Sequence, residues 1–138
     1  PDPGAMLRTV DALLDDGRIC AIGFYPKLCM LKAGLEVMTG AASNNESARN
    51  LRFLLDSSNV ASDTDRKCAD VIVAEKPAAT VSKLTSENRP VSAYWCAILA
   101  IMTHKKDGAA VAAVQKVVEE NSNLLTWEER LLLRKLAE

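Results

Sequence analysis

The chain has 138 residues, of which 49% are hydrophobic and 25% are charged, and its formal net charge is −1. These values are close to the average for globular domains, which excludes disordered and collagen-like chains, and the balanced charge gives no overall attraction to nucleic acid or to membranes. Aromatic residues make up only 4%, while Ala, Leu and Val are abundant, and this composition favours packed helices over a sheet sandwich. We therefore expect an all-α fold, a single compact domain of about six or seven short helices packed around a central buried helix at roughly residues 90–105.

Both ends of the sequence indicate a fragment. Residues 1–6, PDPGAM, are typical of a sequence left by cloning, and the helical pattern is still running at Glu138. We expect residues 7–138 to form one helical domain that was excised from a larger protein.

The first third of the chain predicts two helices. Apolar residues recur at helical spacing over 7–15, and Gly17 follows as a stop. Residues 18–24 fit a helical turn, a short strand or a connector equally well. Pro26 then opens a second helical pattern, which Gly40 ends.

The middle of the chain alternates loops with short helices. The small and amide side chains of residues 41–46 indicate a loop, and apolar spacing over 48–55 predicts the helix that follows it. Residues 62–65 are rich in N-capping side chains and predict another helix, which Pro77 stops. Residues 70–75 also alternate as a strand would. The buried face of this predicted helix would carry Cys68, Val71 and Ile72.

The central helix is predicted from an apolar run at residues 93–102. A turn or short helix over 78–85 leads to it. Pro90 suits a first helical turn, the lysines that follow the run suit the negative end of the helix dipole, and Gly108 suits a left-handed stop. The run is far shorter than the ~20 residues that span a bilayer, so we expect no membrane segment.

The last part of the chain predicts two amphipathic helices. Valines at helical spacing predict the first one, up to Glu120, and residues 121–123 form a loop. Thr126 and Glu129 then match a capping box, in which each side chain satisfies a free backbone N–H at a helix start. The leucines of this final helix exceed what one buried face needs, so some of them should contact a partner or a second copy of the chain: Leu131, Leu132, Leu133 and Leu136.

The cysteines and the single histidine give no sign of a metal centre. The four cysteines are far apart and surrounded by apolar residues, so we expect four buried free thiols and a reducing, intracellular location, cytoplasmic or nuclear. His104 stands in the last turn of the predicted central helix beside two lysines, where a cation facing the helix dipole is the simplest interpretation. The cysteines in question are Cys20, Cys29, Cys68 and Cys96.

The sequence contains no motif for catalysis. We find no phosphate-binding loop, no dinucleotide fingerprint, no zinc-protease motif and no nucleophile elbow. The paired carboxylates of this chain are adjacent in sequence and point in different directions on a helix, which makes them poor acid and base partners. We therefore expect no enzyme activity, no cofactor and no metal.

The candidate partner-binding residues are four basic side chains and one tryptophan. Lys105 and Lys106 stand at the far end of the predicted central helix, while Arg130 and Arg134 share one face of the last helix. They form either ordinary solvated surface or a small patch that binds phosphate or an acidic partner. Trp127 stands in the first turn of the last helix, where core packing is the first interpretation and a partner anchor is the second.

The functional expectation is a non-enzymatic protein-interaction domain, an adaptor or scaffold, whose partner is another protein. A homo-oligomer through the last helix is a further expectation. An apolar helix with Trp and Cys, then a lysine pair, then short amphipathic helices resembles small helical C-terminal domains of viral phosphoproteins and of transcription cofactors that dock on nucleocapsids. This resemblance implies the alternative, a nucleic-acid- or nucleoprotein-binding domain of a viral replication or nucleocapsid-associated protein, although the net charge does not favour nucleic acid.

Overall fold

The computed structural model describes residues 2–87, 90–121, 123 and 125–138. Pro1 and Ser122, which belong to the predicted cloning remnant and to a predicted loop, lie outside these residues. The described part contains two 3-10 helices, η1 (Ile19–Ala21) and η2 (Ala69–Ile72), together with eight α-helices: α1 (Pro3–Leu14), α2 (Tyr25–Thr39), α3 (Asn44–Asp56), α4 (Asp63–Cys68), α5 (Pro77–Glu87), α6 (Pro90–Thr103), α7 (Gly108–Glu120) and α8 (Trp127–Ala137).

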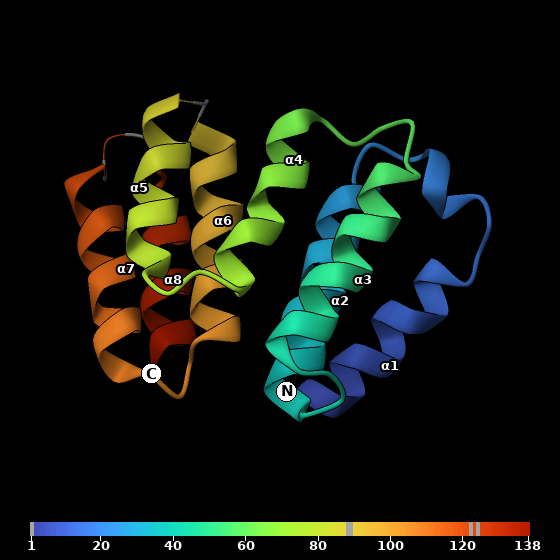
Figure 1. Cartoon of the computed structure of the whole chain (residues 1–138), viewed down its shortest axis with the longest axis horizontal. Helices are drawn as coiled ribbons and strands as arrows, with labels where there is room; N and C mark the ends of the chain where they lie inside the picture. The colour runs from blue at the N-terminus through green and yellow to red at the C-terminus, as the bar shows by residue number, and fades with distance from the viewer. Residues whose placement is uncertain (1, 88–89, 122, 124) are drawn as a thin grey trace.

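The helices form two groups that meet at α6. Figure 1 shows α1, α2 and α3 on one side and α5, α6, α7 and α8 on the other, with α4 and η2 between them. Helix α6 contacts α2 in the first group and α5, α7 and α8 in the second. The expectation of an all-α fold around a central helix is therefore confirmed.

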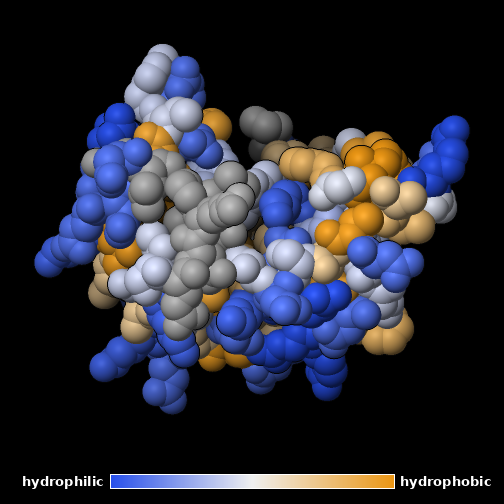
Figure 2. Space-filling view, turned by 90° about the horizontal axis from the view of Figure 1, so that it is seen from above, coloured by the Kyte–Doolittle hydropathy of each residue, from blue (hydrophilic) through white to orange (hydrophobic). Residues whose placement is uncertain are grey.

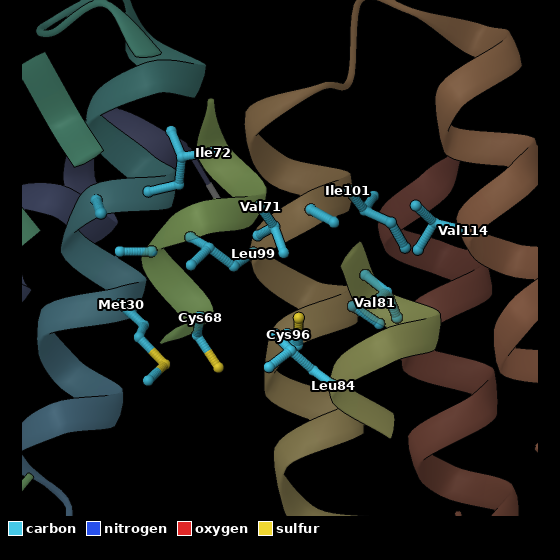
Figure 3. Close-up of a cluster of buried hydrophobic side chains, with 14 of the residues drawn as sticks. Met30, Cys68, Val71, Ile72, Val81, Leu84, Cys96, Leu99, Ile101 and Val114 are labelled. Carbon is cyan, nitrogen blue, oxygen red and sulfur yellow. The ribbon is translucent and has the colours of Figure 1, made fainter. Parts of the chain in front are cut away.

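The core is built around the buried middle of α6. Its residues from Cys96 to Thr103 are buried except for Ile98, which is half-buried. Figure 3 shows the side chains that surround them, with Met30 from α2 on one side and Val81 and Val114 from α5 and α7 on the other. A ten-residue apolar run thus forms a helix that is covered on most of its circumference, as such a sequence requires.

Helices α2 and α6 lie side by side and run in the same direction. Phe24, just before α2, packs against Trp95 near the start of α6. Gly34 lies against Met102 near the end of α6, where a Cβ atom on residue 34 would come within 2.8 Å of the Met102 Cε. The absence of a side chain at Gly34 therefore allows the two helices to approach closely.

Local capping sets most of the helix starts. Thr126 and Glu129 form the predicted capping box of α8. Ser62 forms a second capping box with Asp65 at the start of α4, as the capping residues there predicted. At the end of α2, Gly40 has a φ of 76° and ends the helix where the sequence predicted.

Several boundaries differ from the sequence prediction in the first half of the chain. Helix α1 begins at Pro3, before the predicted start at residue 7, because Asp2 caps it and the proline suits its first turn. Residues 18–24 contain a single 3-10 turn, η1, with connector on both sides. The strand alternative for residues 70–75 is wrong, since η2 occupies the first three of these positions.

The predicted roles of Pro77 and Gly108 are also wrong. Pro77 starts α5 instead of stopping α4, and α5 confirms the short-helix alternative predicted for residues 78–85. Gly108 is the first residue of α7, and the side chain of Asp107 caps this helix by accepting from the N–H of Ala110 at 3.1 Å. Gly40 is the glycine with positive φ among the described residues, so Gly108 is not a left-handed stop.

Candidate functional site

An open hollow of about 640 Å³ lies at the end of the molecule where α6 turns into α7. One wall comes from the end of α2 and the loop to α3, and the other comes from residues 102–107. Two of the predicted site residues, Lys105 and Lys106, line this hollow. The junction after α6 therefore borders a concave part of the surface.

The polar side chains at this hollow are bound to backbone carbonyls of the core. Asn44 Nδ2 donates to the carbonyl oxygens of Ile72 and Thr103, at 2.9 and 3.1 Å. The Nε2–H of His104 donates to the carbonyl oxygen of Val71 at 2.7 Å. These carbonyls lie at or near helix ends, where the backbone oxygens lack partners within the helix. His104 thus contacts η2, whereas the sequence interpretation placed it against the dipole of its own helix.

The two lysines at the hollow differ in their surroundings. The Nζ of Lys105 donates to the carbonyl oxygen of Leu136, in the last turn of α8. A cation at this end of a helix stabilises the last carbonyls and the dipole. Lys106 is exposed at the rim. Lys105 therefore ties the turn after α6 to the end of α8.

The two arginines lie on α8, on the side near α7. Arg134 forms an ion pair with Glu119 of α7, with a Nη2 to Oε1 distance of 3.1 Å, and Arg130 is half-buried one turn earlier. Lys105 therefore contacts the same helix that carries Arg134. Each of the two cations binds a group of this chain: Lys105 binds the carbonyl oxygen of Leu136, and Arg134 binds Glu119. The four basic residues do not form one patch of unengaged cations.

Trp127 lies at the surface. Its side chain is 64% exposed, so the first interpretation, core packing, is wrong. Leu131 and Leu132 on the same helix are 42% and 58% exposed, whereas Leu133 is 2% exposed and belongs to the core. We call Trp127, Leu131 and Leu132 the α8 face.

The α8 face agrees with the prediction that the last helix has more leucines than its buried side needs. Leu133 and the half-buried Leu136 point into the molecule and fix the rotation of α8 about its axis. Residues four apart lie above one another on a helix, so Trp127 and Leu131 form a continuous outer stripe. Large apolar groups that gather at a surface are typical of contact sites.

A second apolar surface was missed in the sequence. Phe24 and Ile22 are each 50% exposed, and the Phe24 ring packs edge to face on Trp95 with 5.7 Å between ring centres. Tyr94 also packs edge to face on Trp95, with 6.0 Å between ring centres. Figure 2 shows hydrophobic side chains gathered over the end of the molecule that carries α1 and η1. Residues 18–24 are rich in apolar side chains, which could have indicated this surface. These side chains do not recur at helical spacing, so the sequence did not show which of them would be exposed.

The cysteines do not form a reactive centre in the described structure. Cys29, Cys68 and Cys96 are buried free thiols, as predicted, but Cys20 is exposed because η1 lies at the surface. The hydrogen bond with Cys68 and burial raise the pKa of Cys96, and burial raises the pKa of Cys29. Both thiols therefore stay protonated and are poor nucleophiles.

The described residues contain neither a candidate metal-binding cluster nor a helix suited to span a membrane. They hold no cluster of three or more His, Cys, Asp or Glu side chains placed to bind a metal ion. None of their helices has the length and apolar character needed to cross a membrane.

Similarity to known proteins gives no further guide to this site. Comparisons of the chain with models of protein families, with curated proteins and with solved structures found no match.

Proposed function

We propose that this chain is a non-enzymatic protein-interaction domain, of the adaptor or scaffold kind, and that the α8 face is its docking surface. One observation carries the proposal: three large apolar side chains of a single helix, Trp127, Leu131 and Leu132, remain between 42% and 64% exposed. Tryptophan is enriched among the residues that dominate the energy of protein interfaces.

The surroundings of the α8 face support a protein partner. Helix α8 is held from behind by the buried Leu133 and at its end by Lys105, so its outer face is presented on a fixed element. A rigid surface loses little conformational entropy on binding. Charged residues border the apolar stripe, as in the polar rim of many interfaces.

The nucleoprotein alternative has less support. It rests on Lys105, Lys106, Arg130 and Arg134, yet Lys105 and Arg134 contact groups of the same chain, and Glu119 adds a negative charge beside Arg134. Binding to a phosphate backbone needs several cations that together neutralise the phosphates and so release the counterions bound to the nucleic acid.

Site-directed photo-crosslinking tests the proposal. A photoreactive phenylalanine analogue replaces Leu131 in one variant and Phe53 in the control, because Phe53 is also a large apolar side chain, 71% exposed, on the distant helix α3. We expect Leu131 to crosslink a protein in cell extract and Phe53 not to do so. Equal crosslinking at both positions would contradict the α8 face. A salt-dependent RNA titration in which reversal of Lys106 and Arg130 weakens binding would favour the alternative.

A further inference from the structure

We infer that the partner of the α8 face is a second copy of this chain, bound so that the two α8 helices run antiparallel. This inference rests on the proposed function and names its partner. It starts from the exposed residues of α8, which are not only apolar but also carry charges in a definite order along the helix.

The charges on α8 change sign from one end to the other. Glu128 and Glu129 stand in the first turn, and Arg134 and Lys135 stand in the last turn. Glu128 and Lys135 are both exposed and lie seven residues apart, on the same side of the helix as Leu131 and Leu132. The helix therefore presents an acidic end, an apolar middle and a basic end to any partner.

An antiparallel pair of such helices is complementary to itself. With the two-fold axis between Leu131 and Leu132, each Leu131 meets Leu132 of the other copy, and Glu128 of one copy lies across from Lys135 of the other. A parallel pair would instead place Glu128 against Glu128 and Lys135 against Lys135. Two-fold interfaces of this kind use the same patch on both subunits.

Contacts within the chain indicate which basic residue of α8 is available for an ion pair with the second copy. Arg134 is already paired with Glu119 on α7, and Lys135 extends from the exposed side of α8. We therefore assign the intermolecular ion pair to Glu128 and Lys135.

The size of the α8 face predicts a reversible dimer. Helix α8 has 11 residues, which corresponds to a length of about 16 Å. One short helix per copy covers less than the area of standard protein interfaces, so we expect the dimer to dissociate on dilution. Because the ion pairs are solvent-exposed, its affinity should fall as the salt concentration rises.

Charge reversal tests the orientation of the two helices. Sedimentation equilibrium of the full chain measures self-association over a wide range of concentration for the wild type, Glu128→Lys, Lys135→Glu and the double variant. We expect each single variant to weaken the dimer roughly tenfold, since it places like charges opposite each other at two symmetric positions, and the double variant to recover. A mixture of the two single variants should form mixed dimers in preference to either dimer alone.

Two further variants complete the experiment. Leu131→Glu places two carboxylates beside the two-fold axis and should abolish the dimer, while circular dichroism checks that the helices remain folded. Lys116→Glu, on the exposed side of α7, is the control and should leave the affinity unchanged.

The outcomes separate this inference from the proposed function. A wild-type chain that stays monomeric at the highest concentration overturns the inference, as does a double variant that fails to recover. A monomeric chain whose α8 face still crosslinks another protein keeps the proposed function and removes the second copy as partner. A dimer that responds to charge reversal as described, with no other protein captured, supports the inference and removes the adaptor role.

Discussion

The corner between α6 and α7 and the outer face of α8 use their side chains in opposite ways. At the corner, Asn44, His104 and Lys105 bind backbone carbonyls, so these polar groups stabilise the fold. On the α8 face, Trp127 and Leu131 leave large apolar groups exposed to solvent. The difference shows that Lys105, a charge that stands out in the sequence, is used inside the chain, whereas leucines that look like core residues remain available for contact.

The largest expected difference in free energy of unfolding is between substitutions of two neighbouring leucines on α8. Leu133→Ala should lower the free energy of unfolding by about 2–5 kcal/mol, because it removes a side chain from the packed core. Leu132→Ala should change it by less than about 0.5 kcal/mol, because residue 132 is mostly exposed. Urea denaturation of dilute protein measures both values. Similar losses for the two variants would mean that α8 is rotated differently about its axis.

A substitution at the corner between α6 and α7 should cause the next largest loss in free energy of unfolding. Asn44→Ala removes the donors to the carbonyls of Ile72 and Thr103 and should cost about 1–3 kcal/mol, because at least one of these oxygens is then left without a partner. Asn45→Ala, at the next and exposed position of α3, is the matched control and should cost much less. The same denaturation curves test this prediction, and an Asn44 variant as stable as the Asn45 variant would exclude a structural role for the corner.

A smaller, pH-dependent effect is expected where Lys27 meets Asp65. Lys27 Nζ donates to the Asp65 carboxylate at 2.7 Å, and the N–H of Ser62 donates to it at 2.9 Å. Burial by itself would raise the pKa of Asp65, but these hydrogen bonds outweigh it and lower the pKa below its usual value. The carboxylate thus binds a proton less readily in the folded chain than in the unfolded chain, so its contribution is present above the unfolded pKa, about 3.9, and is lost as the pH falls through the folded value.

Unfolding measured from neutral pH downwards checks this sign. The stability of the wild type should fall more steeply in acid than that of Asp65→Asn, which has no carboxylate to protonate there. Asp63→Asn is the control in the same helix, because the Asp63 side chain is 94% exposed, and it should follow the wild type closely. Parallel curves for the wild type and Asp65→Asn would rule out this linkage.

The sequence predicted the features that depend on neighbouring residues. The capping box of Thr126 and Glu129 involves residues three apart, and the helix end at Gly40 depends on one residue, so both were predicted correctly. Gly108 was misassigned because glycine suits both a helix end and a helix start. Here the side chain of Asp107 caps α7, so Gly108 is the first residue of that helix. Pro77 was misassigned for the equivalent reason, since proline both stops one helix and suits the first turn of the next.

The candidate site depends on contacts between distant parts of the chain. Lys105 and Leu136 are 31 residues apart, and Asn44 and Thr103 are 59 apart, so no local pattern shows that these side chains serve the fold. The excess of leucine in α8 indicated that some leucines would be exposed. Which of them are exposed follows from the rotation of α8 about its axis, which the packing of Leu133 determines.

Trp127 should give the smallest change in stability. Because its side chain is 64% exposed, Trp127→Ala should alter the free energy of unfolding by less than about 0.5 kcal/mol in dilute protein. The other tryptophan, Trp95, is half-buried in contact with Phe24 and Tyr94 and should dominate the blue side of the fluorescence spectrum. The variant should therefore lose the red-shifted part of the emission and shift the remaining spectrum to shorter wavelength. A large loss of stability, or an emission that moves to longer wavelength, would place Trp127 in the core and remove the central aromatic residue of the α8 face.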